Sequence, residues 1–124
     1  MTLLVDSDIL IEVSRGRDAG IVSRWEELAA SDAAILCSAV SVAELWAGAR
    51  PHESKGLEYL FQTLTCVPAD AVIGRNAGSY LRRFHKSHGV ELGDALIAAT
   101  AVARRARLWT RNRKHYPMDD LSFF

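Results

Sequence analysis

The sequence has only two cysteines and lacks any long apolar run, and both absences restrict what the protein can be. Cys37 and Cys66 stand apart from each other and from any histidine at metal-ligand spacing, which excludes a zinc knuckle or a redox CxxC motif. We expect both to be small buried apolar residues. The longest apolar stretches, such as residues 95–99, fall well short of the roughly 20 residues that cross a bilayer. No membrane-spanning segment is expected.

We also expect no secretory signal, because Asp6 and Asp8 come before any apolar segment could form and no basic segment precedes them. A cytoplasmic location is the default expectation. With 124 residues, of which 49% are hydrophobic and 24% charged, the composition is that of an ordinary globular domain. We expect a single domain that spans residues 1–124.

Basic and acidic residues balance at 15 each, but they are unevenly distributed. Residues 1–70 carry 11 acids and 5 bases, whereas residues 71–124 carry 4 acids and 10 bases. Six bases lie close together near the C-terminus: Arg104, Arg105, Arg107, Arg111, Arg113 and Lys114. A run of this kind is either a solvated helix face or a phosphate-binding surface, and composition does not separate the two.

Short apolar strands alternate with amphipathic helices along the chain. The apolar runs predict strands at residues 2–5, 34–37, 66–68, 108–110 and 121–124. Helical spacing predicts a helix that begins near residue 7 and further helices at about 18–30, 41–48, 52–64, 70–88 and 94–105. This order predicts an α/β fold with a central parallel sheet of about five short strands and helices on both faces. Functional residues in such a sheet lie at the carboxyl ends of the strands.

Three acids stand among apolar residues where solubility does not require them: Asp6, Glu44 and Asp94. A carboxylate buried in such surroundings needs a cation or hydrogen-bond donors. Several carboxylates that converge repel one another unless a metal ion neutralises them. Oxygen ligands select a hard ion, and Mg²⁺ or Mn²⁺ suits a site of a few carboxylates.

Each acid also has a purely structural interpretation. Asp6 or Ser7 can cap the first helix, and Asp94 can cap a later one. Ser41 and Glu44 match a capping box. No single acid is specific, but all three come at helix starts next to strand ends, which are neighbouring points in a parallel sheet.

Four segments of the sequence resemble, in order, the signature blocks of PIN domains of the VapC type. They are residues 5–10 (VDSDIL), 41–45 (SVAEL), 94–101 (DALIAATA) and 110–116 (TRNRKHY). The resemblance implies a compact α/β fold with a parallel sheet. It also implies an Mg²⁺- or Mn²⁺-dependent endoribonuclease, the toxin of a VapBC toxin–antitoxin pair, which a VapB antitoxin blocks and which forms a homodimer.

The resemblance also assigns site residues. Asp6, Glu44 and Asp94 match the family's acidic triad, which binds the metal, and Asn112 occupies the fourth site position. His115 stands where other branches of the family have a further acid, so the fourth carboxylate is missing.

On this basis an ion held by Asp6 and Asp94, with Glu44 as a direct or water-mediated ligand, would activate water for attack on an RNA phosphate. Asn112 would hold Asp6 or a metal-bound water by hydrogen bonding. Three cations are candidate contacts for flanking phosphates: Arg111, Arg113 and Lys114. Ser41 and Thr110 are candidate donors that orient the acids.

Other interpretations remain open. Asp6 and Asp8 after a strand, with Asp119 and Asp120 near the end, superficially fit a haloacid-dehalogenase-like phosphatase, although the companion residues of that family are poorly met. A receiver domain lacks its accepting aspartate and its lysine. A catalytically silent PIN module that only binds RNA or protein is a third possibility. The sequence does not specify the RNA target.

Overall fold

Four short parallel strands form one sheet in the computed structural model, which describes all 124 residues. Their order across the sheet is β3-β2-β1-β4. The bounds are β1 Thr2–Val5, β2 Ala34–Ser38, β3 Thr65–Val67 and β4 Arg107–Trp109. β1 is therefore central, and its register places Leu4 opposite Leu36 on one side and Leu108 on the other.

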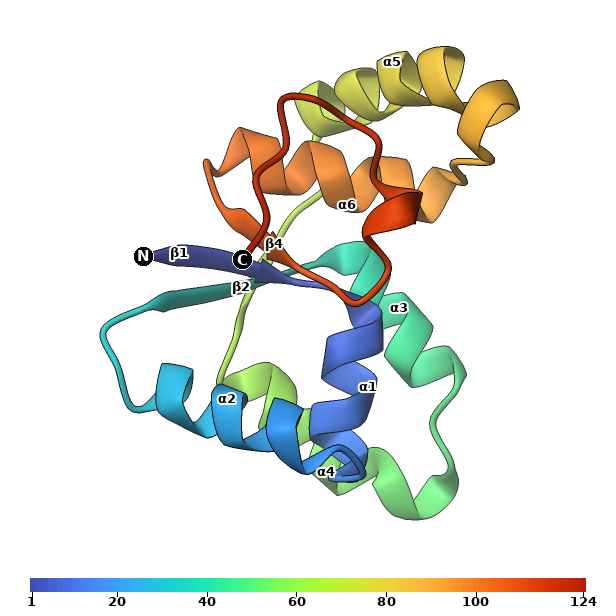
Figure 1. Cartoon of the computed structure of the whole chain (residues 1–124). Helices are drawn as coiled ribbons and strands as arrows, with labels where there is room; N and C mark the ends of the chain where they lie inside the picture. Colours follow the sequence, from blue (N-terminus) through green and yellow to red (C-terminus); the bar gives the residue numbers. More distant parts are fainter.

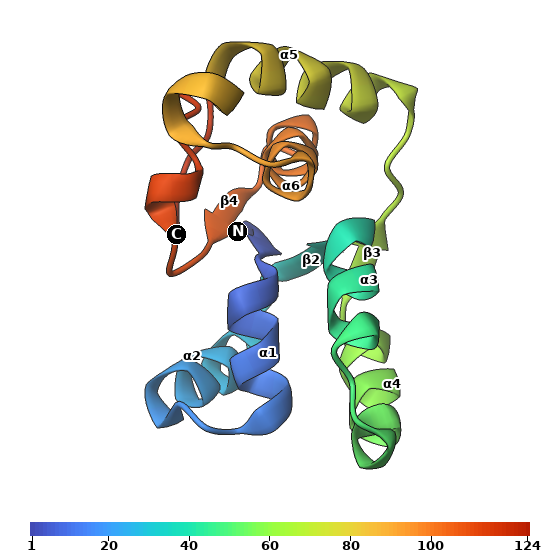
Figure 2. The same cartoon turned by 90° about the vertical axis from the view of Figure 1, so that its right-hand side faces the viewer.

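Six helices cover the sheet on both faces (Figure 1). They are α1 Ser7–Arg15, α2 Ala19–Ala29, α3 Ala39–Ala47, α4 Ser54–Gln62, α5 Ala71–His88 and α6 Leu92–Ala103. Two 3-10 turns complete the chain: η1 Pro51–Glu53 and η2 Arg113–His115. In Figure 1, α5 and α6 lie above the sheet, with α1, α2 and α4 below it. Turned by 90°, the lower helices separate into an α1–α2 pair and an α3–α4 pair (Figure 2).

The apolar residues of the sheet divide between two cores, one on each face. Leu4 packs with residues of α5 and α6, whereas Leu3 and Val5 pack with residues of α1, α2 and α4. All three of these β1 residues are completely buried. A strand covered on both faces has no polar side to present, which explains the unbroken apolar run at the N-terminus.

The predicted α/β architecture is confirmed, with four strands where about five were expected. The segment 121–124 forms only an isolated parallel bridge between Leu108 and Phe123. Within β4, the backbone groups of Ser122 and Phe124 hydrogen-bond only Leu108, and the Phe124 ring packs edge-on against Trp109. The segment therefore closes the β4 edge at one residue and does not extend the sheet.

The prediction of two buried cysteines is half wrong. Cys37 is buried in the central part of the sheet, but Cys66 is exposed. The two residues are register partners on neighbouring strands, and β3, which carries Cys66, is the edge strand. No helix of the structure is both long enough and apolar enough to cross a membrane.

Two helices begin earlier than the sequence predicts. α3 begins at Ala39, because the Ser38 side chain accepts a hydrogen bond from the amide of Val40 and caps the helix. Ser41 therefore lies inside the helix, and the proposed Ser41–Glu44 capping box is wrong. α6 begins at Leu92 with Glu91 as its cap, so Asp94 lies in the first turn and is not the cap itself.

Candidate active site

Asp6 lies between the end of β1 and the first residue of α1, at the carboxyl end of the central strand. Its Oδ1 accepts a hydrogen bond of 2.7 Å from the amide of Ser7, so the capping role suggested by the sequence is real. Capping uses only one carboxylate oxygen. The residue is only 6% exposed, and a carboxylate buried to this extent requires donors or a cation.

The second oxygen of Asp6 has two further donors. Thr110 Oγ1 and the Tyr116 hydroxyl each donate to Oδ2 at 2.8 Å. Thr110 directly follows β4, the neighbour of β1, and Tyr116 follows η2. Burial, together with the charge of Asp6, raises the pKa of Tyr116, so this phenol keeps its proton and remains a donor. Asp6 is thus held rigidly by groups from three parts of the chain.

Glu44 reaches the same edge of the sheet from α3. Its Oε1 lies 2.9 Å from the Ser7 hydroxyl, which in turn lies 2.8 Å from Ser41 Oγ. Ser41, expected to orient an acid, therefore acts on Glu44 through Ser7. Glu44 is exposed and not buried as its apolar neighbours in sequence suggested. Those neighbours, such as Leu45, point to other sides of the helix.

Asp8 is an acid of the site that the sequence did not assign. Its Oδ2 accepts hydrogen bonds from the amide of Arg111 at 3.0 Å and from Asn112 Nδ2 at 3.1 Å. Its Oδ1 is buried and has no hydrogen-bond partner. Burial, and to a lesser degree the charge of Asp6, raises the pKa of Asp8. The Asn112 side chain thus bonds Asp8, and not Asp6, which was one of its two expected partners.

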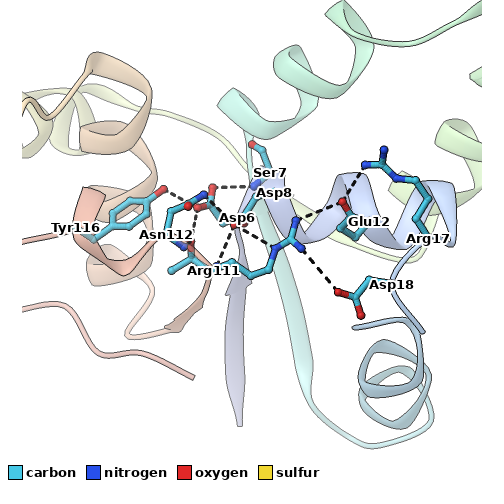
Figure 3. A network of polar contacts seen from close by, with 10 residues as sticks. Asp6, Ser7, Asp8, Glu12, Arg17, Asp18, Arg111, Asn112 and Tyr116 are labelled. Atoms are coloured by element: carbon cyan, nitrogen blue, oxygen red, sulfur yellow. Dashed lines mark hydrogen bonds and ion pairs between the residues drawn. The ribbon is translucent and has the colours of Figure 1, made fainter. Parts of the chain in front are cut away.

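The Arg111 side chain is exposed at the surface, but its guanidinium points towards three acids (Figure 3). Its guanidinium is 3.3 Å from Glu12, 3.8 Å from Asp18 and 3.9 Å from Asp8. Glu12 also pairs with Arg17 at 2.8 Å. Arg111 therefore joins the segment after β4 to α1 and to the cap of α2.

Asp94 enters the site from the first turn of α6. Its Oδ2 accepts a hydrogen bond of 3.3 Å from the amide of Glu91. Burial raises the pKa of Asp94, and the charge of Asp6 adds to this rise, while the Glu91 amide and His115 oppose it. Asp6 and Asp94 line the same depression.

One depression of about 450 Å³ collects these side chains. Five carboxylates line it: Asp6, Asp8, Glu44, Glu91 and Asp94. Its other lining residues are Ser7, Ile11, Gly93, Ile97, Asn112 and His115. No lysine or arginine lines the depression. The three acids singled out from the sequence therefore meet at one place, with two more acids that were missed.

The comparison with known proteins agrees with the geometry of the site. The family profile of the PIN domain matches residues 3–121 of this chain. The chain belongs to the PIN-domain family. Ribonuclease VapC10 from Mycobacterium tuberculosis is 42% identical over 117 residues, which are 94% of this chain and 86% of the relative. Ribonuclease VapC19 from the same organism is 34% identical over 122 residues, 93% of this chain and 92% of the relative.

Solved structures show the same fold. VapBC2 from Rickettsia felis, bound to a DNA fragment from the promoter, superimposes with a TM-score of 0.84 at 23% identity, covering 100% of this chain and 98% of the other. VapBC-1 from nontypeable Haemophilus influenzae gives a TM-score of 0.80 at 23% identity, covering 100% and 97%. The PIN fold expected from the sequence is therefore confirmed over the whole chain.

The donors of this PIN domain suit a hard divalent cation. Carboxylate oxygens are the ligands that Mg²⁺ and Mn²⁺ prefer, and one such oxygen, Asp8 Oδ1, is buried with no partner. No three acidic, histidine or cysteine side chains converge closely enough in this structure to ligate one ion together. Asp6, Glu44 and Asp94 therefore share a depression without forming a preassembled cage. Mg²⁺ commonly binds through one or two carboxylates and keeps several waters, which is compatible with this arrangement.

The C-terminal basic run divides between two ends of the PIN domain. Arg104, Arg105 and Arg107 lie between the end of α6 and the first residue of β4, at the edge of the sheet opposite the depression. Arg113 donates to the backbone oxygen of Phe124 and stacks over the Phe123 ring. Of the three cations expected at RNA phosphates, Lys114 is exposed and takes part in none of the ion pairs, whereas Arg111 is held by carboxylates as described above.

The acids of the phosphatase interpretation do not converge. Asp120 lies 2.8 and 2.9 Å from the Tyr80 hydroxyl on α5, and Asp119 pairs with Arg83 at 3.5 Å. Neither residue lines the depression that holds Asp6 and Asp8. Nothing in the geometry supports a four-aspartate phosphatase site.

Sequence reasoning missed Asp8 and Glu91 as members of the site and Tyr116 as a partner of Asp6. Asp8 carried a signal, because it stands two residues after the strand-end Asp6 and so in the first turn of the same helix. Glu91 stands three residues before Asp94, which is the spacing of a capping box. Tyr116 is 110 positions from Asp6, and only the folded chain brings the two together.

Proposed function

We propose that this PIN domain is a metal-dependent endoribonuclease that hydrolyses RNA phosphodiester bonds, the toxin of a VapBC pair. The observation that carries the proposal is that Asp6, Glu44 and Asp94 line one depression at the carboxyl edge of the sheet. Ribonucleases VapC10 and VapC19 match it over almost the whole chain. The wider acidic lining, with one unpaired buried oxygen on Asp8, supports a cation site at the same place.

Asp6, Glu44 and Asp94 are the side chains proposed to hold Mg²⁺ or Mn²⁺, and Asp8, whose Oδ1 has no partner, adds a carboxylate beside Asn112 at the fourth position. A bound divalent ion lowers the pKa of its water and stabilises charge on a phosphate. The protein itself orients the carboxylates that would hold the ion. Tyr116 and Thr110 fix one oxygen of Asp6, and this carboxylate cannot turn away without breaking both hydrogen bonds.

In this proposal Asn112 positions the aspartates of the site. Its amide donates to Asp8, and its backbone N–H donates to Thr110 Oγ1 at 3.0 Å, so it joins the holders of the two aspartates. The side chain is uncharged and adds a donor without adding further repulsion among five carboxylates. Among the three cations expected at phosphates, the free charge of Lys114 favours it over Arg111 and Arg113 as the contact beside the site.

The proposed protein partner is a VapB-type antitoxin. The structures that superimpose on this chain include VapBC assemblies from Rickettsia felis and from Haemophilus influenzae. Inhibition by the antitoxin and assembly as a homodimer are part of the same proposal. Size measurement of the purified chain tests the homodimer, and RNA cleavage with and without added antitoxin tests the inhibition.

Cleavage of a mixed pool of structured RNAs tests the enzymatic proposal. The purified chain is incubated with Mg²⁺, Mn²⁺ or EDTA, beside an Asp94→Asn variant and a matched Asp32→Asn variant. Asp32 is exposed in the loop before β2 and lies outside the depression, so its replacement removes the same charge without touching the site.

We expect cuts with either metal, no cuts in EDTA, loss of cleavage in Asp94→Asn and normal cleavage in Asp32→Asn. Full activity of the Asp94 variant would refute the assignment of the site. Hydrolysis of p-nitrophenyl phosphate without any RNA cleavage would refute the ribonuclease.

A further inference from the structure

The depression poses an electrostatic problem for an RNA substrate. Five carboxylates line it, and RNA carries a negative charge on every phosphate. Arg111, which follows β4 beside the depression, lies 3.3 to 3.9 Å from three carboxylates, and these offset its charge. Even with a bound divalent ion, the lining keeps an excess of negative charge. Attraction for the RNA backbone must come largely from cations outside the depression.

The exposed face of α5 carries such cations. No acid occurs between Asp70 and Glu91, and Arg75, Arg82 and Lys86 are all exposed. At about 100° per residue these three positions fall within about 40° of one another around the helix axis. The buried face of α5, which carries Ile73, Ala77 and Tyr80, points in the opposite direction. We call Arg75, Arg82 and Lys86 the α5 basic stripe.

None of the three stripe residues takes part in an ion pair. Some arginines elsewhere in the protein are paired: Arg15 with Glu53, Arg17 with Glu12 and Arg24 with Glu27. Even the neighbouring Arg83, on the side of α5, pairs with Asp119 at 3.5 Å. The stripe is therefore a row of uncompensated charge.

The stripe leads to the active site. α5 ends at His88, the chain turns at Gly89, and Glu91 already lines the acidic depression. Figure 1 shows the C-terminal end of α5 and the start of α6 on the same side of the molecule as η2, which carries Lys114. At about 1.5 Å per residue, Arg75 and Lys86 are separated by about 16 Å along the helix, a span of several nucleotides.

We propose that the α5 basic stripe binds the sugar–phosphate backbone of the RNA substrate and guides the strand to the acidic depression. The proposal rests on the ribonuclease function proposed above and adds to it the surface that supplies affinity. The stripe is charged throughout and has no large apolar side chain between its members. The centre of a protein–protein interface, in contrast, is depleted of charge. An RNA backbone therefore suits the stripe better than a protein partner does.

Two triple variants of equal charge test this inference. Arg75, Arg82 and Lys86 are changed to glutamine in the stripe variant, and Arg104, Arg105 and Arg107 in the control variant. The control residues are also exposed and absent from the ion pairs, but they lie at the edge of the sheet opposite the acidic depression. Glutamine has a helix propensity close to those of arginine and lysine, so α5 should stay folded. Thermal melting checks this.

Binding is measured in the Asp94→Asn background by fluorescence anisotropy, with a labelled single-stranded RNA and a labelled RNA stem-loop, from 50 to about 300 mM salt. Each phosphate contact contributes about 0.7 to the slope of log K against log salt for a single strand, so three lost contacts should flatten the slope by about 2. We expect the stripe variant to bind about tenfold or more weakly at low salt. The control variant should stay within about twofold of its parent.

Equal losses in the two triple variants would mean that only net charge matters and would overturn the inference, as would unchanged RNA binding by the stripe variant. Weakened binding of poly-glutamate with unchanged RNA binding would assign the stripe to an acidic protein and would also overturn it. In the wild-type background the stripe substitutions should raise KM for RNA and leave kcat within about twofold.

The two proposals fail separately. If the unsubstituted protein cleaves no RNA but binds it through the stripe, the ribonuclease proposal fails and the binding surface stands.

Discussion

Replacement of Tyr116 by phenylalanine removes one buried hydroxyl and leaves the rest of the side chain in place. Tyr116 is 3% exposed, and its hydroxyl donates to Asp6 Oδ2 at 2.8 Å. Thr110 remains as a donor to the same oxygen. The substitution therefore weakens the support of Asp6 without changing the acid itself or the volume of the core.

The structure sets the size of the effect. A hydrogen bond to a charged group contributes about 1.5–3 kcal/mol to folding, and the remaining donor Thr110 favours the lower end of that range. For a domain of this size such a loss lowers the melting temperature by about 5 °C. Groups that orient a metal ligand typically affect metal affinity or activity by about 10–100-fold. We expect Tyr116→Phe to lower the cleavage rate at saturating RNA by about tenfold or more.

Tyr80→Phe provides a matched control. Tyr80 is 4% exposed, and its hydroxyl also meets a carboxylate, Asp120, at 2.8 and 2.9 Å. This pair lies outside the acidic depression. Tyr80→Phe should lose stability in the same way and keep a cleavage rate within about twofold of the unchanged protein.

Melting curves and single-turnover cleavage rates with Mn²⁺ are measured for Tyr116→Phe, Tyr80→Phe and the unchanged protein at a temperature where all three are folded. A normal rate for Tyr116→Phe would refute the reasoning. Equal loss of rate in the two variants would attribute the effect to stability alone.

Three further predictions rest on other parts of the structure. Burial raises the pKa of Asp94, so the ionised carboxylate lowers the stability of the folded protein at a pH above that pKa. This cost disappears at a pH below the pKa of Asp94 in the unfolded chain. Without metal, Asp94→Asn should therefore melt about 2 °C or more above the unchanged protein at pH 7, with no such gain near pH 3. A thiol reagent at neutral pH should label exposed Cys66 rapidly and Cys37 only on unfolding, because burial, aided by Cys66, raises the pKa of Cys37 to about 12. Arg111→Gln should lower the melting temperature more than Lys114→Gln, because only Arg111 joins α1 and the α2 cap to the segment after β4; equal melting temperatures would contradict this.

The parts of the fold that depend on local pattern were predictable. The apolar run of β1 and the helical spacing of α5 identified both elements, and Asp70 caps α5 as expected. The segment 121–124 was predicted as a strand because it is apolar, but pairing depends on a neighbour, and only Phe123 finds one. The exposure of Cys66 follows from strand order, which a sequence does not state.

At the site, too, local pattern identified some residues, whereas others depend on the folded chain. Asp6, Glu44 and Asp94 were predicted because each stands near a strand end or helix start and matches a family block, and the structure gathers them in one depression. Asn112 was expected to bond Asp6 or a metal-bound water, and its side chain bonds Asp8, two residues further along the chain. Tyr116 gave no signal, because a buried tyrosine near the C-terminus has no local feature that identifies a partner at the N-terminus.

Direct measurement of Mn²⁺ binding tests the central claim, that the acids at the carboxyl edge of the sheet form the metal site of a ribonuclease. Electron paramagnetic resonance would quantify bound Mn²⁺ in the unchanged protein, in Asp6→Asn and in the Asp32→Asn control. The account predicts that Asp6→Asn weakens Mn²⁺ binding by about tenfold or more while Asp32→Asn binds normally. Equal Mn²⁺ affinity in all three proteins would contradict it.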